Sequence, residues 1–174
     1  MLRLRPALPD DLALVHELVV ALAQYENLLH EVDATAATLG AALFGPAPRV
    51  FCEIAEWHSG SGFEGAGLAL WFYNFSTFRG RHGIYLEDLF VRPAMRDRGI
   101  GRALLARLAR RCVDEGLARL EWAVLDWNAP SRRFYESLGA QPLPAWVLHR
   151  LSRESLLQLA QTAAAGESGA PDLR

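Results

Sequence analysis

The sequence predicts a single α/β domain in which helices flank a mixed, mostly antiparallel β-sheet. Strand-like runs alternate with helical periodicities, and no stretch rich in Gly, Pro or Ser divides the chain. The 174 residues, 51% of them hydrophobic, suffice for one domain with a full core. We place the domain at residues 1–165 and expect residues 166–174, which are mainly small and polar, to form a flexible tail.

The individual elements follow from local patterns. Residues 2–5 alternate apolar and basic side chains before Pro6, which is typical of a short strand. Apolar residues recur at helical spacing from Leu12 to Leu22, and Asp33 is a candidate N-cap. We expect strands at residues 2–5, 50–55, 67–75, 84–91, 120–125 and 145–151. We expect helices at residues 12–22, 33–44, 130–139 and 152–164, and a long helix that opens near Gly101 and closes at Gly116.

Composition excludes several classes of protein. A net charge of -2 gives no basic excess for binding nucleic acid. The N-terminus has no apolar segment of signal-peptide length, and the longest apolar run is too short to span a membrane. Cys52 and Cys112 lie in apolar stretches without metal-ligand spacing, so we expect buried free thiols in a reducing compartment. The sequence therefore predicts a cytoplasmic protein without a metal, a nucleic-acid partner or a membrane segment.

One segment carries the pattern of a ligand-binding turn. The strand-like run Tyr-Leu-Glu-Asp-Leu-Phe-Val at residues 85–91 leads to Arg-Asp-Arg-Gly-Ile-Gly at residues 96–101, where the long helix opens. Glycines in such a turn let backbone N–H groups approach a phosphate, which the helix dipole also favours. The turn lacks the Gly-Lys-Ser/Thr of a P-loop and the first glycine of a dinucleotide fingerprint. By itself the pattern is also compatible with simple packing of a helix on a strand.

The order of the motifs around this turn resembles the GNAT superfamily of N-acetyltransferases. There, the turn after the fourth strand binds the pyrophosphate of acetyl-CoA, and a fifth strand leads to a short helix that bears a tyrosine. Residues 120–125, Asn-Ala-Pro-Ser at 128–131 and Phe-Tyr-Glu-Ser-Leu-Gly-Ala at 134–140 supply both in order. Residues 85–91 and 126–128, with Tyr-Glu at 25–26, are similar to the diamine (spermidine/spermine) and thialysine acetyltransferase branch. The resemblance extends from Arg3 to about residue 160.

This resemblance implies a sheet with splayed central strands, acetyl-CoA as co-substrate, no metal, and direct transfer of the acetyl group to a primary amine of a small molecule. Relatives in this branch are homodimers, and some exchange C-terminal strands. We therefore expect a homodimer in which residues 145–151 contribute to the interface.

Two residues are the candidate catalytic groups. An alkylamine with a pKa of about 10 must lose a proton before it attacks a thioester, and a carboxylate near the acyl carbon can accept that proton. Glu87 and Asp88 are adjacent in a predicted strand and point to opposite faces, and the resemblance favours Glu87 as the carboxylate in the cleft. Tyr135 matches the tyrosine that the family uses as proton donor to the departing thiolate. Without the resemblance, both side chains have ordinary structural roles, as a surface carboxylate and a packed ring.

The resemblance also assigns the binding residues. The cofactor-binding residues that it implies are Leu89, Phe90, Val91, Arg96, Asp97, Arg98, Gly99, Ile100, Gly101, Asn128 and Ser131. Leu89 is the candidate whose N–H polarises the acetyl carbonyl, and Asn128 and Ser131 are also candidate helix caps. The substrate-binding residues that it implies are Tyr25, Glu26 and Glu87.

The sequence departs from the family pattern at two places, one near the pyrophosphate and one that leaves the substrate open. Asp97 stands where many relatives have glycine and brings a negative charge to the pyrophosphate turn. Residues 141–145 lack the acids that polyamine-acetylating relatives carry near this point, which leaves Glu26, Glu31, Glu87 and Glu121 as acidic candidates. A small amine or a thialysine-like side chain is therefore at least as compatible as a polyamine. A protein or peptide N-acetyltransferase and a non-catalytic acyl-CoA-binding module are the alternatives.

Overall fold

The computed structural model describes residues 1–167, and the chain divides into two compact units, Met1–Arg132 and Arg133–Arg174. We describe each unit by itself. The predicted single domain at residues 1–165 remains a prediction, and residues 168–174 of the predicted tail lie outside the described residues.

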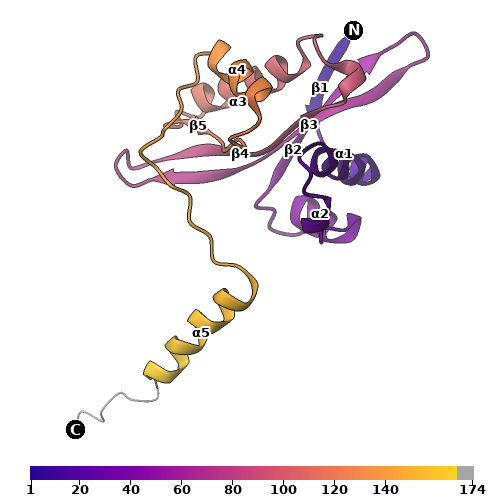
Figure 1. The fold of residues 1–174 in the computed structure, drawn as a ribbon. Coiled ribbons are helices and arrows are strands. Elements are labelled where there is room, and N and C mark those ends of the chain that lie inside the picture. Colours follow the sequence, from indigo (N-terminus) through magenta and orange to yellow (C-terminus); the bar gives the residue numbers. More distant parts are fainter. Residues whose placement is uncertain (168–174) are drawn as a thin grey trace. The chain divides into compact units, whose positions relative to one another are not determined.

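The first unit is built on a five-stranded sheet (Figure 1). The strands follow one another in chain order across the sheet, and neighbours are antiparallel except for the last pair, which is parallel. Their bounds are β1 (Leu2–Pro6), β2 (Phe51–His58), β3 (Phe63–Ser76), β4 (Arg81–Val91) and β5 (Leu120–Glu121). The prediction of a mixed, mostly antiparallel sheet is thus confirmed.

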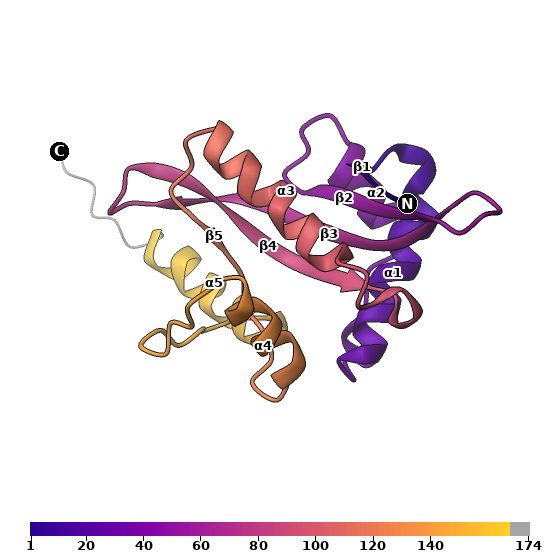
Figure 2. The same cartoon turned by 90° about the horizontal axis from the view of Figure 1, so that it is seen from above.

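Helices cover both faces of this sheet (Figures 1 and 2). α1 (Leu12–Tyr25) and α2 (Ala36–Phe44) lie on one face, and α3 (Ile100–Asp114) lies on the other. Single 3-10 turns at Pro9–Asp11, Leu29–Glu31 and Pro93–Met95 lie before α1, between α1 and α2, and between β4 and α3.

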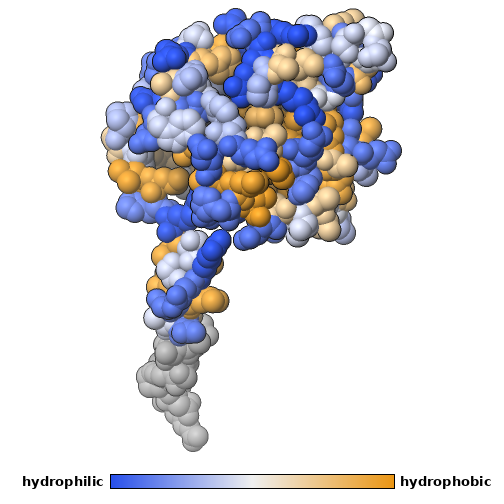
Figure 3. Space-filling model, turned by 45° about the vertical axis from the view of Figure 1, so that its right-hand side comes forward, coloured by the Kyte–Doolittle hydropathy of each residue, from blue (hydrophilic) through white to orange (hydrophobic). Residues whose placement is uncertain are grey.

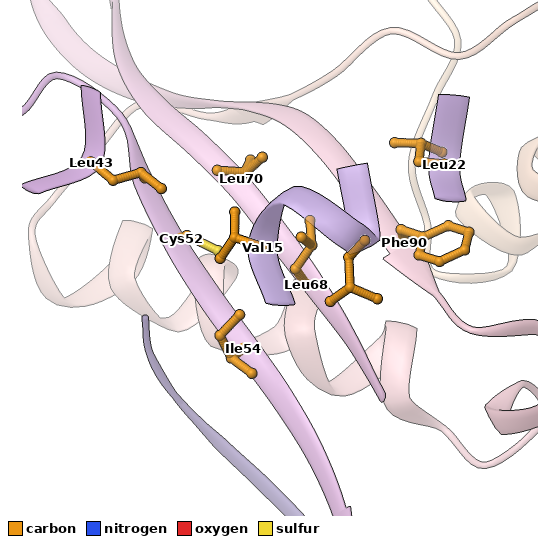
Figure 4. Close-up of a cluster of buried hydrophobic side chains, with 9 residues drawn as sticks. Val15, Leu22, Leu43, Cys52, Ile54, Leu68, Leu70 and Phe90 are labelled. Carbon is orange, nitrogen blue, oxygen red and sulfur yellow. The ribbon is translucent and has the colours of Figure 1, made fainter. Parts of the chain in front are cut away.

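The core on the α1 face is apolar and closely packed. Val15 and Leu18 of α1 are fully buried, and with Leu22 they meet side chains of α2 and of the three central strands (Figure 4). The other members of this cluster are Leu43, Cys52, Ile54, Leu68, Leu70 and Phe90. Burial raises the pKa of the Cys52 thiol to about 12, which keeps it protonated. Cys52 and Cys112 are both free and buried, as predicted.

An ion pair joins α3 to the opposite face of the sheet. Glu53 of β2 is 2% exposed, and its Oε2 accepts a hydrogen bond of 2.6 Å from Nε of Arg107. The guanidinium of Arg111, one turn further along α3, lies 5.1 Å from the centre of the Trp71 ring. A buried carboxylate without its cation would strongly destabilise the folded protein. The ion pair therefore favours the one position of α3 in which Arg107 reaches Glu53.

The described part of the second unit, up to residue 167, contains two helical segments. α4 (Ala129–Ser137) begins in the first unit and ends in the second, and α5 (Arg153–Glu167) lies within the second unit. The predicted strand at residues 145–151 is wrong, because these residues adopt no strand. An apolar run satisfies only the side-chain requirement of a strand; its backbone groups also need a partner strand.

Two other boundaries differ from the prediction for identifiable reasons. α2 begins at Ala36 rather than near Asp33, because Thr35 is its N-cap and the Thr35 hydroxyl accepts from the N–H of Thr38 at 3.2 Å. The strand predicted at residues 120–125 is reduced to Leu120–Glu121, which alone pair with β4.

The surface combines polar and apolar side chains. Hydrophilic side chains, in blue, predominate on the face seen in Figure 3, and orange apolar patches lie between them. Within residues 1–167, no helix is long and apolar enough to cross a membrane.

Candidate active site

A gap in hydrogen bonding runs along the outer edge of β4. β5 pairs with β4 only at Ile84–Leu120 and Tyr85–Glu121, so no strand within residues 1–167 pairs with residues 86–91 on that side. The chain after Glu121 leaves the sheet, and this separation is the splay that the family resemblance implies. Unpaired backbone groups at such an edge can bind an extended ligand as a further strand would.

The direction of each N–H group decides which residues face the gap. The N–H of Arg92 donates to the carbonyl of Ala66 in β3, at 2.9 Å. Because N–H directions alternate along a strand, those of Leu89 and Val91 point away from β3, toward the gap. Phe90 of β4 pairs with Leu68, so its backbone N–H and C=O groups face β3 and not the gap. Its side chain is 3% exposed and lies in the core.

The turn at residues 96–101 has the backbone of a glycine-dependent anion site. Gly99 is the N-cap of α3 with a φ of 74°, and an added Cβ there would meet no atom within 4 Å. The first helical bond of α3 runs from Ala103 N to Gly99 O, so the N–H groups of Ile100, Gly101 and Arg102 precede the helical ladder. Asp97 has a φ of 61°, a conformation that glycine adopts without strain. The negative charge of Asp97 therefore occupies a position suited to glycine, as expected from the sequence.

The two arginines beside Asp97 pack on aromatic rings. The Arg96 guanidinium lies 4.7 Å from the centre of the Tyr25 ring, and Nε of Arg96 donates to the Val91 carbonyl at 3.2 Å. The Arg98 guanidinium lies 5.1 Å from the centre of the Trp57 ring. Both cations are held by cation–π contacts at the turn, where they can offset the charge of Asp97.

A bulge in β4 gives the adjacent Glu87 and Asp88 different surroundings. Leu86 pairs with Trp71 while Asp88 pairs with Leu70, so Glu87 is the extra residue between two pairs. Leu70 belongs to the core on the α1 face, and paired residues share a face, so Asp88 lies on that face as well. Glu87 itself is exposed. The bulge places Leu86 and Asp88, two positions apart, on opposite faces of the sheet, which the simple alternation of a regular strand does not allow.

Asp88 is a functional candidate that sequence reasoning missed. Burial, and then the negative charges of Glu87 and Glu26, raise its pKa to about 7. Burial also raises the pKa of Glu26, the C-cap of α1. The end of α1 and the bulge of β4 thus bring three carboxyl groups into electrostatic contact. The acidic pair at 87–88 was visible in the sequence, but the bulge that places its partly buried second member on the α1 face was not.

The raised pKa of Asp88 predicts a pH dependence of stability. Between pH 3.8 and about 7 the folded protein binds a proton at Asp88 that the unfolded chain releases, so this contribution to stability decreases as pH rises through that window. We expect Asp88→Asn to be more stable than the parent at pH 8 and nearly equal at pH 4, measured by urea unfolding. Glu64→Gln, at an exposed carboxylate of β3, is the matched control. A pH-independent difference between Asp88→Asn and the parent would contradict the prediction.

Glu121 has a structural role. It accepts a hydrogen bond from the Asn74 amide at 2.6 Å and forms an ion pair with Arg119 at 2.8 Å. The bond to Asn74 connects β5 to β3 across β4, and together these contacts remove Glu121 from the candidates for binding an amine.

Asn128 and Ser131 form the cap of α4. The Asn128 side chain is 3% exposed, and its Oδ1 accepts from the N–H of Ser131 at 3.2 Å. The same oxygen accepts from the Tyr25 hydroxyl at 3.2 Å. The predicted capping role of Asn128 is confirmed, and Tyr25 is brought next to it from a position 103 residues away.

Tyr135 belongs to the second unit. Its side chain is half-buried, and its ring centre lies 5.3 Å from that of Phe134. The Tyr135 carbonyl accepts from the N–H groups of Leu138 and Ala140, which end the helix. The predicted placement of its hydroxyl at the reacting sulfur stays a prediction.

Histidine, cysteine and acidic side chains do not gather into a metal site. In the part of the chain that the structure describes, no group of three or more of them is arranged to hold an ion.

Comparisons with known proteins agree with this architecture. Residues 33–140 match the acetyltransferase (GNAT) family. A thialysine N-epsilon-acetyltransferase of Bos taurus is 35% identical over 164 residues, which cover 90% of this chain and 96% of the relative. An L-ornithine N5-acetyltransferase of Arabidopsis thaliana is 31% identical and covers 88% of this chain and 86% of the relative.

A solved structure has the same fold. An integron cassette protein from the mobile metagenome of V. cholerae matches with a TM-score of 0.75 at 24% identity, over 92% of this chain and 98% of that chain. The family match covers more than half of the sequence, and the edge of β4 and the turn before α3 have the form that this family implies. The chain is therefore an acyltransferase that belongs to the GNAT family of acetyltransferases.

Proposed function

We propose that this protein transfers the acetyl group of acetyl-CoA directly to a primary amine of a small molecule. The observation that carries the proposal is the unpaired edge of β4, which ends next to the turn at residues 96–101. The N-terminal part of this edge carries the carboxyl groups of Glu87 and Asp88. Its C-terminal end leads to the N–H groups in the first turn of α3. Relatives named for acetylating thialysine and ornithine support a small amine as acceptor.

In this proposal the co-substrate lies along the edge of β4. The N–H groups that open α3 bind the pyrophosphate, with Arg96, Arg98 and Arg102 supplying positive charge near Asp97. The N–H groups of Leu89 and Val91 bind the pantetheine arm, and that of Leu89 also polarises the acetyl carbonyl. The Nδ2 group of Asn128, which donates to no described residue, is available to the other side of the arm.

The reaction requires the amine to lose a proton and the departing thiolate to gain one. The amine nitrogen forms an amide bond to the acetyl carbon as the bond from that carbon to sulfur breaks. Glu87 holds the ammonium group and passes its proton to water, and Asp88, with a pKa of about 7, is a second group matched to that task at neutral pH. The hydroxyl of Tyr135 donates a hydrogen bond or a proton to the departing thiolate.

A panel of acceptors tests the proposed substrate class. Acetyl-CoA turnover is measured with ornithine, thialysine, a diamine, spermidine and an N-terminal peptide at equal concentrations. We expect one of the small amines to be used fastest, because the carboxyl groups of Glu26, Glu87 and Asp88 attract an ammonium group. Faster turnover of the peptide than of every small amine would instead support a peptide acetyltransferase.

The turn at residues 96–101 gives a prediction about co-substrate affinity. Gly99→Val places a β-branched side chain at a φ of 74° beside the N–H groups that open α3, so we expect the KM for acetyl-CoA to rise at least about 10-fold. Gly80→Val is the matched control, since Gly80 has a φ of 60° and equally open surroundings in the turn between β3 and β4. It should lose similar stability and keep the parental KM. A folded Gly99→Val enzyme with unchanged KM would remove this turn from the binding site.

We also expect a homodimer with residues 145–151 at its interface. The support is the homodimer that the sequence resemblance implies, together with the exposure of Trp146, Val147 and Leu148, each about three-quarters exposed. Light scattering at micromolar concentration should give about twice the monomer mass of 19.3 kDa. A monomeric mass would contradict the expectation.

A further inference from the structure

The side chain of Tyr25 joins three separate segments of the first unit. Tyr25 is the last residue of α1, and its hydroxyl donates to Oδ1 of Asn128 at 3.2 Å. On the same ring, Arg96 lies 4.7 Å from the centre, and the Trp127 ring is tilted by 51° at 6.3 Å. A single aromatic residue therefore contacts the turn that precedes α3 and the turn that precedes α4.

The contact with Asn128 fixes the direction of an amide group. The N–H of Ser131 can only donate, so the atom of Asn128 that faces it is the oxygen, and that oxygen can also accept from Tyr25. Two donors on one oxygen hold the amide plane in place. They also determine where Nδ2 points, and Nδ2 is the atom available to a ligand. Without the Tyr25 hydroxyl, only the cap to Ser131 restrains this side chain.

The contact with Arg96 acts on the other side of the site. Nε of Arg96 is held by the carbonyl of Val91, and its guanidinium rests on the Tyr25 ring. Arg96 begins the turn in which Asp97 and Gly99 both have positive φ values. A cation on an aromatic face is attracted to the negative face of the ring, and this attraction favours one placement of the flexible Arg96 side chain.

We propose that Tyr25 is a positioning residue for the co-substrate: it orients Asn128 and Arg96 so that both sides of the acetyl-CoA site are formed before binding. This inference rests on the proposed function, because acetyl-CoA is the molecule that Asn128 and the turn would contact. The family resemblance implies that Tyr25 binds the amine; in this proposal its hydroxyl instead donates to Asn128, acts on coenzyme binding and reaches the amine only indirectly. The acidic residue that follows it, Glu26, remains available to the amine.

The test is a double-mutant cycle read by calorimetric binding of coenzyme A. Tyr25→Phe removes the hydroxyl and keeps the ring, and we expect the Kd for coenzyme A to rise about 3- to 10-fold, the effect of one lost hydrogen bond. Asn128→Ser keeps a capping side chain and removes the amide. If Tyr25 acts through Asn128, adding Tyr25→Phe to Asn128→Ser should change the Kd by less than about 2-fold, whereas independent effects would multiply.

Two further variants make the cycle specific. Tyr25→Leu also removes the ring under Arg96 and should weaken coenzyme A binding more than Tyr25→Phe does. Tyr73→Phe is the matched control, since it deletes a hydroxyl that donates to Glu115 at 2.6 Å on the α3 face, and it should leave the Kd unchanged. The KM for the amine should stay within about 2-fold of the parent in Tyr25→Phe.

Several results would overturn the inference. Multiplicative effects in the cycle, or a rise in the KM for the amine with an unchanged Kd for coenzyme A, would make Tyr25 a direct substrate contact. A lower melting temperature with unchanged Kd in Tyr25→Phe would make the hydroxyl merely structural. These outcomes differ from failure of the proposed function, which would appear as a parent protein that binds no coenzyme A or acetylates no amine.

Discussion

Tyr135→Phe is expected to lower kcat about 10²-fold while folding and coenzyme A binding are retained. The substitution keeps the ring that lies beside Phe134 and deletes only the hydroxyl. A tyrosine with an ordinary pKa of about 10 cannot fully protonate a thiolate whose thiol has a pKa of about 8.5, but a strong hydrogen bond stabilises the charge that develops on sulfur. Steady-state kinetics with saturating amine and acetyl-CoA measure the effect.

The pH profile distinguishes this role from others. Loss of a proton donor is not restored by alkali, so the kcat deficit of Tyr135→Phe should persist as pH rises. Tyr73→Phe, which deletes a tyrosine hydroxyl on the α3 face, should retain the parental kcat. Parental kcat in Tyr135→Phe would show that the hydroxyl has no part in the reaction.

Glu87→Gln is expected to lower kcat/KM for the amine about 10²-fold at pH 7, because it removes the charge that holds the ammonium and accepts its proton. The deficit should shrink toward pH 10, where a growing fraction of an ordinary alkylamine is already neutral. The KM for acetyl-CoA should stay near the parental value. The decisive data are kcat/KM profiles of parent and variant over this pH range.

The neighbouring acid provides an internal check. The charge of Glu87 contributes to the raised pKa of Asp88, so Glu87→Gln should lower that pKa below about 7. Glu64→Gln, at an exposed carboxylate of β3, should alter neither profile. A Glu87→Gln enzyme with a parental profile would leave Asp88 as the group that accepts the proton.

The sequence predicted those parts of the fold that depend on local pattern. α1 and α3 were found because their apolar residues repeat at helical spacing, and Gly116, with a φ of 64°, follows α3 as expected for a C-terminal glycine. Strand predictions failed where hydrogen-bonded pairing with another strand decides whether a segment forms a strand. Residues 122–125 carry a strand-like pattern but leave β4, and residues 145–151 carry another without forming a strand.

The candidate site was predictable in its motifs and not in its contacts. The turn at residues 96–101 was recognised because Gly99 and Gly101 stand at fixed positions at the start of a helix. The bulge at Glu87 depends on how β3 pairs with β4, and the bond from Tyr25 to Asn128 joins positions 103 residues apart. Both arise from tertiary packing, which no local pattern encodes.

The most direct test of acetyl transfer is to measure both products of one reaction, free coenzyme A and the N-acetylated amine. The protein is mixed with acetyl-CoA and the best amine of the acceptor panel, free thiol is titrated over time, and the amine is analysed by mass spectrometry. Our account predicts that thiol appears only when the amine is present and that one N-acetylated amine forms for each thiol released. Thiol release that does not depend on the amine, or its absence with every amine although coenzyme A binds, would contradict it.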